Sequence, residues 1–286
     1  MKLKQLKINF IEALSGGYPP EEIQSFFHWL AESYLGYSRF DVSVKAEEEV
    51  SKEISAKFHT ALQRLQNHEP IQYIIGETEF YGLPFIVTPA TLIPRPETEE
   101  LVHWIIEESK NQKSDFKILD IGTGTGCIAV SLAKNIKNAQ VSALDISAEA
   151  IKVAQKNAAI HKVEVTFFQA DILKTKTLPQ QYHVIVSNPP YVRNLEKAHM
   201  QPNVVQHEPE SALFVTNEDP LLFYRKITQR AKTHLTPNGS LYFEINEYLS
   251  KEMKQLLEQE GFTEIELKKD MFGKYRMLKC KLPMDL

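Results

Sequence analysis

The stretch VIVSNPPYV, residues 184–192, places an amide, two prolines and an aromatic ring directly after a short apolar run. A run of this kind is typical of a buried strand. Neither Pro189 nor Pro190 has a backbone N–H, so carbonyls are the only backbone hydrogen-bonding groups there. The residues from Asn188 onward therefore predict a surface made of hydrogen-bond acceptors.

An acceptor surface of this composition suits a planar amino group or an amide. The Asn188 side-chain oxygen and the Pro189 carbonyl can accept both protons of a planar –NH2, while the Tyr191 ring covers its flat face. Asn-Pro is also common turn chemistry, so a simple turn that ends the strand is the alternative interpretation. A glycine-rich stretch upstream in the same array of strands favours the functional interpretation.

That glycine-rich stretch, ILDIGTGTGCIAVSLA, combines an acid, a tight turn and the start of a helix. Asp120 ends the strand, and Gly122, Gly124 and Gly126 let the backbone turn sharply and approach a ligand closely. The start of the helix offers free N–H groups. The next strand ends in Asp145, where a carboxylate can hydrogen-bond the two hydroxyls of a ribose. The pattern predicts an adenosine site.

Two classes of protein use such a site, and the glycines alone do not separate them. Counted from Gly122, the dinucleotide pattern G-x-G-x-x-G fails at Cys127, but counted from Gly124 the looser G-x-G-x-x-A pattern is met through Ala129. An oxidoreductase with a nicotinamide dinucleotide is therefore an alternative. Asp120 before the glycine run resembles motif I of the class I methyltransferases, which implies S-adenosylmethionine as the cofactor.

The elements that must position these residues begin near residue 95. Helical segments there alternate with short apolar strands, namely FKILDI, QVSALDI, VTFFQAD, HVIVSN and SLYFEIN. This rhythm predicts a doubly wound α/β fold, a parallel sheet with helices on both faces. In such a sheet Asn188 lies at the carboxyl end of the fourth strand, beside the crevice that holds ligands. The last two strands, near 263–269 and 275–282, are expected to pair antiparallel.

In the amino-terminal part of the chain, the spacing of apolar residues is helical. Apolar residues recur at helical spacing in two stripes, the first made of Ile23, Phe26, Phe27, Leu30 and Tyr34 and the second of Val50, Ile54, Phe58, Leu62 and Leu65. Residues 71–94 are rich in β-branched and aromatic residues around a Gly82 break, which predicts a β-hairpin. The predicted domains are a helical substrate-recognition domain over 1–70, a hairpin linker over 71–94 and the α/β domain over 95–286.

Composition and charge narrow the partners. The net charge of −4 over 286 residues gives no overall basic field, which disfavours nucleic acid as the main partner. The two cysteines form no CxxC pair, as expected in a reducing compartment. No apolar run is long enough to span a bilayer, and we expect a cytoplasmic protein without membrane contact. The nine histidines show no metal-ligand spacing, so no metal is expected.

Two further stretches carry a resemblance to a known family. NPPY, residues 188–191, resembles motif IV of the amino-methyltransferases, which act on adenine N6 or on glutamine side-chain nitrogen. Together with GETEFYGLPFIVTPATLIPRPETEELV, it closely resembles the peptide chain release factor N5-glutamine methyltransferase family, from about residue 70 to the end. RPETE, residues 95–99, favours this family over the related enzyme for a ribosomal protein. An adenine-N6 nucleic-acid methyltransferase, the other alternative, usually carries a DNA-recognition region.

The resemblance implies an enzyme that transfers a methyl group from S-adenosylmethionine to a glutamine side-chain amide in release factors. It also implies a mostly parallel, seven-stranded methyltransferase sheet with a smaller all-helical N-terminal domain. For the cofactor, it implies that Gly122, Thr123, Gly124, Thr125 and Gly126 wrap the methionine part, Asp145 holds the ribose, and Asp171, Ile172 and Asn188 complete the site. For substrate binding and catalysis, it implies Asn188, Pro189, Pro190 and Tyr191.

Overall fold

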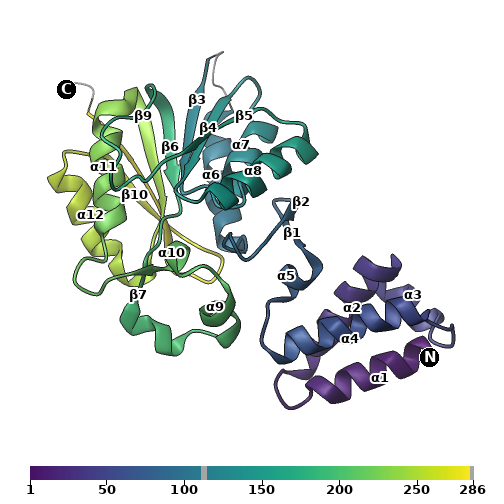
Figure 1. Ribbon diagram of the computed structural model, residues 1–286. Helices are drawn as coiled ribbons and strands as arrows, with labels where there is room; N and C mark the ends of the chain where they lie inside the picture. The colour runs from purple at the N-terminus through teal and green to yellow at the C-terminus, as the bar shows by residue number, and fades with distance from the viewer. Residues whose placement is uncertain (111–114, 284–286) are drawn as a thin grey trace. The chain divides into compact units, whose positions relative to one another are not determined.

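The computed structural model describes residues 1–110 and 115–283, while residues 111–114 and 284–286, within the segment 95–286, lie outside the described residues. The chain divides into two compact units (Figure 1). The helical unit comprises Met1–Gly76 together with Gln201–His207, and the sheet unit comprises Glu77–Met200 with Glu208–Leu286. Within the described ranges, no helix is long and apolar enough to cross a membrane.

The helical unit is held by an aromatic core of its own. Its helices are α1 (Leu3–Leu14), α2 (Pro20–Leu35), α3 (Arg39–Val44), α4 (Lys52–Gln66), α5 (Ile71–Ile75) and α9 (Pro202–His207). Phe27 lies at the centre, with its ring centroid 5.6 Å from that of Phe10 and 5.2 Å from that of Phe58. The first predicted apolar stripe falls on α2 and the second on α4, except for Val50, which precedes that helix. Their residues are buried or half-buried because they face this core.

A short hairpin opens the sheet unit. Strands β1 (Glu77–Phe80) and β2 (Leu83–Ile86) pair antiparallel. Both turn residues have positive φ, 52° at Tyr81 and 70° at Gly82, as in a type I′ turn. This turn matches the twist of the two strands, and it lets Phe80 and Phe85 bury their rings in the core of the sheet unit.

The main sheet has seven strands in the order β10-β11-β9-β6-β3-β4-β5. Their bounds are β3 (Lys117–Ile121), β4 (Gln140–Asp145), β5 (Val165–Gln169), β6 (Tyr182–Ser187), β9 (Leu235–Glu244), β10 (Thr263–Lys269) and β11 (Tyr275–Lys281). The strands β9, β6, β3, β4 and β5 are parallel, whereas β11 pairs antiparallel with both β9 and β10. The predicted mostly parallel sheet with an antiparallel final pair is confirmed.

Helices cover both faces of this sheet. Helices α6 (Pro96–Ser109), α7 (Cys127–Asn135) and α8 (Ala148–His161) pack on one face, and α11 (Leu222–His234) and α12 (Ser250–Gln259) pack on the other. Side chains alternate along each strand, so Ile118 joins the first layer and Leu119 the second. The remaining short elements are β7 (Val192–Arg193), η1 (Asn194–His199), α10 (Glu210–Leu213), β8 (Phe214–Val215) and η2 (Glu247–Leu249).

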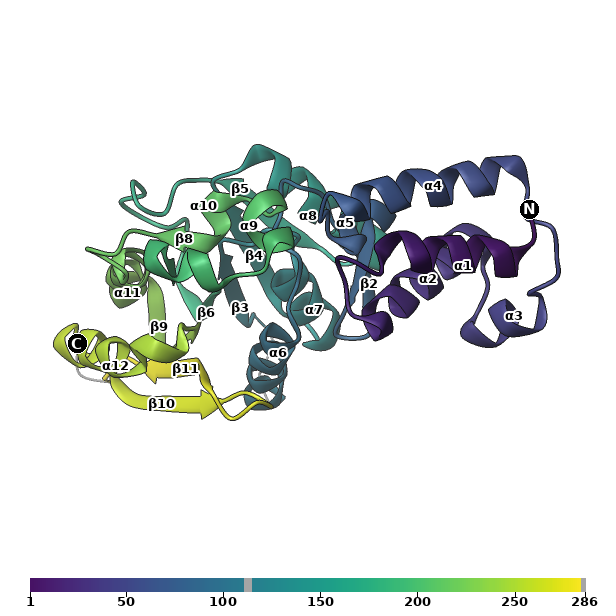
Figure 2. The same cartoon turned by 90° about the horizontal axis from the view of Figure 1, so that it is seen from below.

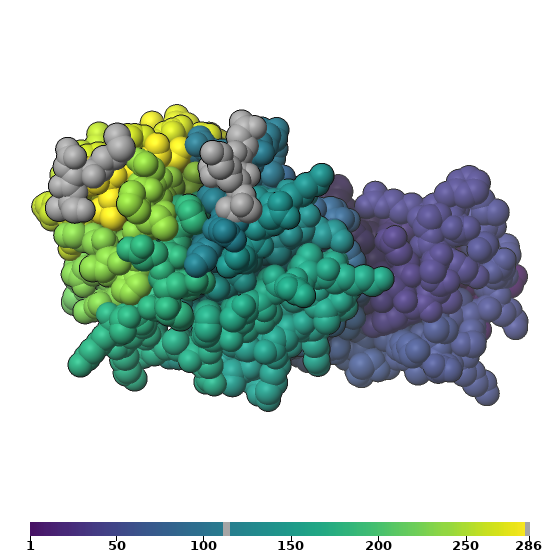
Figure 3. Space-filling view, turned by 90° about the horizontal axis from the view of Figure 1, so that it is seen from above, coloured from purple at the N-terminus to yellow at the C-terminus, as the bar shows by residue number. Residues whose placement is uncertain are grey.

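The strand order creates a switch point beside β3. The chain runs from β3 through β4 to β5 on one side, and then returns to place β6 on the other side of β3. The loops after β3 and β6 therefore diverge at the carboxyl ends of the strands, where open α/β sheets bind ligands. Figure 2 shows this side, with β8 and α10 nearby, and Figure 3 shows the opposite face, where β3 begins.

Candidate active site

A cavity of about 240 Å³ lies at the carboxyl ends of β3, β4, β5 and β6. Most of the sequence-predicted site residues line it, namely Gly122, Thr123, Gly124, Thr125, Asp145, Asp171, Ile172, Asn188, Pro189 and Pro190. Gly126 and Tyr191 are not among the lining residues. The sheet therefore brings the glycine-rich loop and the acceptor motif, which are far apart in the sequence, onto one cavity.

The glycine-rich loop needs all three of its glycines, but for two different reasons. Their φ angles are 76° at Gly122, 54° at Gly124 and 80° at Gly126, a region that other residues rarely adopt. A Cβ added at Gly122 or Gly124 would meet no atom within 4 Å, whereas one at Gly126 would lie 3.0 Å from the Ala154 Cβ. The first two glycines keep the cavity wall open, and the third permits the close approach of α7 and α8.

Asp145, the last residue of β4, fixes the loop and still has acceptor capacity. Its Oδ2 accepts a hydrogen bond from the Gly124 N–H at 2.9 Å, and its Oδ1 accepts one from the Ser147 N–H at 2.9 Å. A carboxylate has about four lone-pair sites, so each oxygen can accept again. Asp145 is half-buried at the cavity, which leaves these sites available to a ligand with hydroxyl groups.

Asp120 lies fully buried beneath the glycine-rich loop. Burial raises its pKa to about 7, although the hydrogen bond from Thr123 opposes this shift. That bond joins the Thr123 Oγ1 to the Asp120 Oδ2 at 2.6 Å, while Oδ1 has no hydrogen-bond partner among the described residues. The raised pKa increases the fraction of neutral acid near pH 7, which lowers the cost of burying the group.

The acceptor motif is anchored by side chains on both sides. Ser187, the last residue of β6, donates from Oγ to the Ile121 carbonyl at 2.6 Å and so couples β6 to β3. Asn188 donates from Nδ2 to the Thr98 Oγ1 at 3.3 Å. Thr98 in turn donates to the Glu244 Oε2 at 2.5 Å. Asn188 is therefore held by a residue at the start of α6 and, through it, by the end of β9.

Tyr191 is not among the residues that line the cavity. Its hydroxyl donates to the Glu244 Oε1 at 3.0 Å, and its ring packs against the buried layer between the sheet and α11. Burial raises the pKa of Glu244, and hydrogen bonds from Thr98 and Tyr191 offset only part of this rise. Burial and the Glu244 charge both raise the pKa of Tyr191, which keeps its hydroxyl protonated. Tyr191 thus ties the end of the motif to Glu244 of β9.

Sequence reasoning missed three residues that shape this site. Thr98 and Glu244 hold the acceptor motif, and Glu208 holds the cavity wall by pairing with Arg95 at 2.5 Å and accepting from the Ile93 N–H at 3.1 Å. Glu244 lies near the end of the apolar stretch SLYFEIN, so an acid near the end of a strand could have indicated it, as it did for Asp145. Thr98 lies within RPETE, the stretch that carried the family resemblance, although no role was predicted for it, and for Glu208 the local sequence holds no comparable signal.

The loop after β5 also contributes residues to the cavity wall. Asp171 accepts a hydrogen bond from the Leu173 N–H at 2.9 Å through its Oδ1, which fixes the turn. Ile172 is buried and turns an aliphatic side chain to the cavity. The wall therefore combines an acid with an apolar surface, as a flat heteroaromatic ligand requires.

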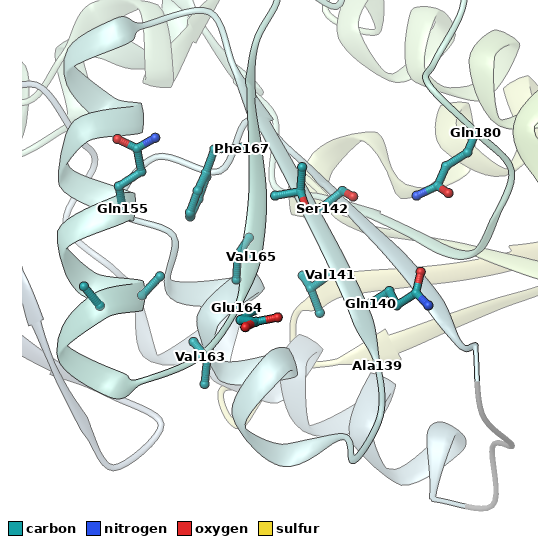
Figure 4. A pocket seen from close by; sticks show the side chains of 13 residues that line it. Ala139, Gln140, Val141, Ser142, Gln155, Val163, Glu164, Val165, Phe167 and Gln180 are labelled. Atoms are coloured by element: carbon teal, nitrogen blue, oxygen red, sulfur yellow. The ribbon is translucent and has the colours of Figure 1, made fainter.

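A larger hollow, of about 560 Å³, lies along β4, β5 and α8 (Figure 4). Its side chains are mostly amides and aliphatic groups, including Gln140, Gln155, Gln180 and Val165. None of the sequence-predicted site residues lines it. We therefore assign the chemistry to the smaller cavity.

Both units are similar in sequence to known protein families. Residues 101–212 match the family described as methyltransferase small domain, and residues 9–76 match the family described as PrmC N-terminal domain. The release factor glutamine methyltransferase of Flavobacterium psychrophilum is 50% identical over 281 residues, which cover 98% of this chain and 99% of that protein. The protein of the same name from Bacteroides thetaiotaomicron is 42% identical, covering 93% of this chain and 95% of that protein.

A solved structure supports the fold independently. A methyltransferase from Pyrococcus furiosus is similar with a TM-score of 0.51 and 19% identity, covering 78% of this chain and 98% of that one. At this identity the similarity concerns the fold alone.

Proposed function

Because the chain belongs to the family of release factor glutamine methyltransferases, we propose that it methylates the side-chain amide nitrogen of a glutamine in a peptide chain release factor. The methyl donor of this family is S-adenosylmethionine. One observation carries the proposal: Asn188 and Pro189 line the same cavity as the glycine-rich loop and Asp145. The residues proposed to accept hydrogen bonds from an amide thus line the same cavity as those proposed to bind an adenosine cofactor.

The residues of the cavity fit this cofactor. A side chain at Gly122 or Gly124 would extend from the wall with no protein atom near its Cβ, so glycine there keeps room for a ligand. Asp145 has acceptor sites for the ribose hydroxyls, and Ile172 offers an apolar wall for the adenine. We propose that residues 122–126 hold the methionine part. When bound, S-adenosylmethionine supplies an electrophilic methyl group on a positively charged sulfur.

We propose that Asn188 and Pro189 orient the substrate amide. An amide nitrogen is a poor nucleophile, because its lone pair is delocalised into the carbonyl. The Asn188 Oδ1 and the Pro189 carbonyl oxygen each accept one of its N–H groups, which fixes the amide plane. Orientation and preorganised electrostatics then supply most of the acceleration. Pro190 supplies no N–H that would compete for these acceptors.

A dedicated base is not needed in this mechanism. The methylated nitrogen is acidic enough to release its proton to a hydrogen-bond acceptor or to water. The sequence from Val184 through Leu195 accordingly contains no His, Asp or Glu. Glu244, the buried acid behind the motif, accepts hydrogen bonds from Thr98 and Tyr191 and is not among the residues that line the cavity.

Methyl incorporation tests the function directly. The purified protein should transfer label from S-adenosylmethionine to a release factor, and a release factor whose acceptor glutamine is replaced by alanine should take up none. Duplex DNA should remain unlabelled, because the chain has a net charge of −4 and offers no overall attraction for a phosphate backbone. Label in DNA, with none in the release factor, would overturn the proposal in favour of an adenine methyltransferase.

We also propose that the reaction takes place in the cytoplasm. Cys127 and Cys280 are free and buried, a thiol state expected in a reducing compartment. Burial raises the pKa of Cys127 to about 12, so this thiol stays protonated and unreactive although it lies at the cavity.

We propose that the helical unit recognises the release factor. It has its own core, contributes none of the residues that line the cavity, and exposes two large aromatic side chains. Trp29 is 42% exposed and Phe40 is 75% exposed. Exposed aromatic residues of this kind are frequent anchors in protein interfaces.

Replacing both Trp29 and Phe40 with alanine should raise KM for the release factor by about tenfold or more, because each truncated anchor costs about 1 kcal/mol or more. Steady-state kinetics at saturating cofactor measures this, and kcat should stay near the wild-type value. Ile160→Ala is the matched control, since Ile160 is 50% exposed on α8 of the sheet unit. An unchanged KM in the double variant would contradict recognition through these two residues.

A further inference from the structure

Three side chains form a hydrogen-bonded chain that runs from the half-buried Asn188 of the acceptor motif to two buried residues behind it. Asn188 Nδ2 lies 3.3 Å from the Thr98 Oγ1, which lies 2.5 Å from the Glu244 Oε2. Thr98 is 3% exposed and Glu244 is 1% exposed. The three residues come from the end of β6, the first turn of α6 and the end of β9, so only the folded sheet unit assembles them.

The chemistry of this chain gives it a direction. A carboxylate can only accept hydrogen bonds, so Glu244 requires the single hydroxyl proton of Thr98. The Thr98 oxygen then faces Asn188 with lone pairs alone, and it can be satisfied only by the amide N–H2. Burial raises the pKa of Glu244, and the Thr98 and Tyr191 hydroxyls and the positive charge of Arg276 oppose this rise and so favour the carboxylate form.

This direction decides how the Asn188 amide is turned. The oxygen and nitrogen of an amide have nearly the same shape, so packing alone does not distinguish the two orientations. With Nδ2 bound to Thr98, Oδ1 remains as the acceptor that Asn188 can offer to a ligand. The opposite orientation would set an N–H2 group against the N–H2 group of a substrate amide.

We propose that Thr98, held by Glu244, is a positioning residue that keeps the Asn188 oxygen directed toward the substrate amide. This inference rests on the proposed function for its substrate. Glu244 strengthens the arrangement from the other end of the motif, because its second oxygen accepts from Tyr191. A further bond, from Asn246 Nδ2 to the Tyr191 carbonyl at 3.1 Å, holds the backbone there. The motif is thus fixed at its first and last residues.

Thr98→Val tests the inference, because valine keeps the branched shape and removes the hydroxyl. We expect kcat for release-factor methylation to fall by about 10- to 100-fold, on the scale of a small misplacement of a reacting group. KM for the release factor and the affinity for S-adenosylhomocysteine, measured by calorimetry, should change little. Thr98→Ser, which restores the hydroxyl, should return kcat to within about threefold of wild type.

Thr228→Val is the matched control. Thr228 is fully buried on α11, and its hydroxyl has no hydrogen-bond partner among the described residues, so its loss should leave kcat unchanged. A Thr98→Val enzyme that turns over as fast as Thr228→Val would overturn the inference. So would a Thr98→Ser enzyme as slow as Thr98→Val, because the hydroxyl would then not be the group that matters.

A measurement on the unaltered protein keeps the inference testable if Thr98→Val fails to fold. In NMR spectra with labelled asparagine side chains, the Asn188 Nδ2 protons should show a through-space contact to the Thr98 methyl group. If the Asn188 Nδ2 protons show no through-space contact to the Thr98 side chain, the amide is turned the other way. This readout needs no turnover, so it separates an error in the amide orientation from an error in the proposed function, which labelled methyl transfer by the wild-type enzyme tests.

Discussion

Asn188→Ala should lower kcat for methylation of a release-factor glutamine by about 10²-fold or more, the scale of losing one preorganised hydrogen-bonding partner. The substitution removes the side-chain oxygen at the cavity and leaves the glycine-rich loop and Asp145 in place. The affinity for S-adenosylhomocysteine should therefore change much less than kcat. Single-turnover labelling of the release factor measures the chemical step, and calorimetry measures the cofactor site.

Asn188→Asp provides a sharp comparison for this prediction. Aspartate retains acceptor oxygens at the cavity, but it has no N–H to donate to the Thr98 Oγ1. Its charge would also attract the cofactor's sulfonium and disturb the geometry. We therefore expect Asn188→Asp to be slow as well. Near-normal turnover of Asn188→Ala would rule out the proposed role of this amide.

Gly126→Ala should destabilise the sheet unit by about 2–5 kcal/mol, because two costs add. A non-glycine residue in the left-handed region costs about 1–2 kcal/mol, and Gly126 has a φ of 80°. The new methyl group would also lie 3.0 Å from the Ala154 Cβ, and overpacking of this kind costs about 1–3 kcal/mol. Both costs fall on the folded state, at the contact between α7 and α8.

Urea unfolding can isolate this effect, since each unit contains one tryptophan. In a Trp29→Phe background, the fluorescence of the buried Trp104 reports on the sheet unit alone. Gly261→Ala is the control, because Gly261 has a φ of 85° but an added Cβ there meets no atom within 4 Å. Its loss of stability should be about 1–2 kcal/mol. Equal losses in the two variants would show that α8 moves away from the added methyl group at no cost.

The sequence was sufficient to predict the sheet because parallel strands are buried on both faces. Such strands appear as continuous apolar runs, and residues 183–188 and 240–246 are examples. The loops that follow them carry the glycines and the amide at the ends of strands, so the cavity could be placed as well. The helical part of the chain was predicted from its apolar stripes in the same way.

Contacts between distant segments could not be predicted in this manner. Thr98 is separated from Asn188 by 90 positions and from Glu244 by 146, and periodicity does not reveal which strand ends become neighbours. The hydrogen-bond partner of the Tyr191 hydroxyl could not be predicted for a related reason. That its ring covers the substrate amide remains a prediction, while a buried carboxylate from β9 accepts the hydrogen bond of its hydroxyl. The strand order, which sequence patterns alone do not supply, decides both.

The membership of Gln201–His207 in the helical unit has a consequence for biosynthesis. Residues 1–76 leave the ribosome first, but α9 completes their unit, and a His207 ring nitrogen lies 2.8 Å from the Asn67 carbonyl oxygen. At about 5–20 residues per second, the interval between these two segments is on the order of ten seconds. During that time the amino-terminal helices of the nascent chain lack α9, while the strands β3 to β6 are being synthesised. The helical unit is therefore completed only after a large part of the sheet unit, residues 77–200, has been synthesised.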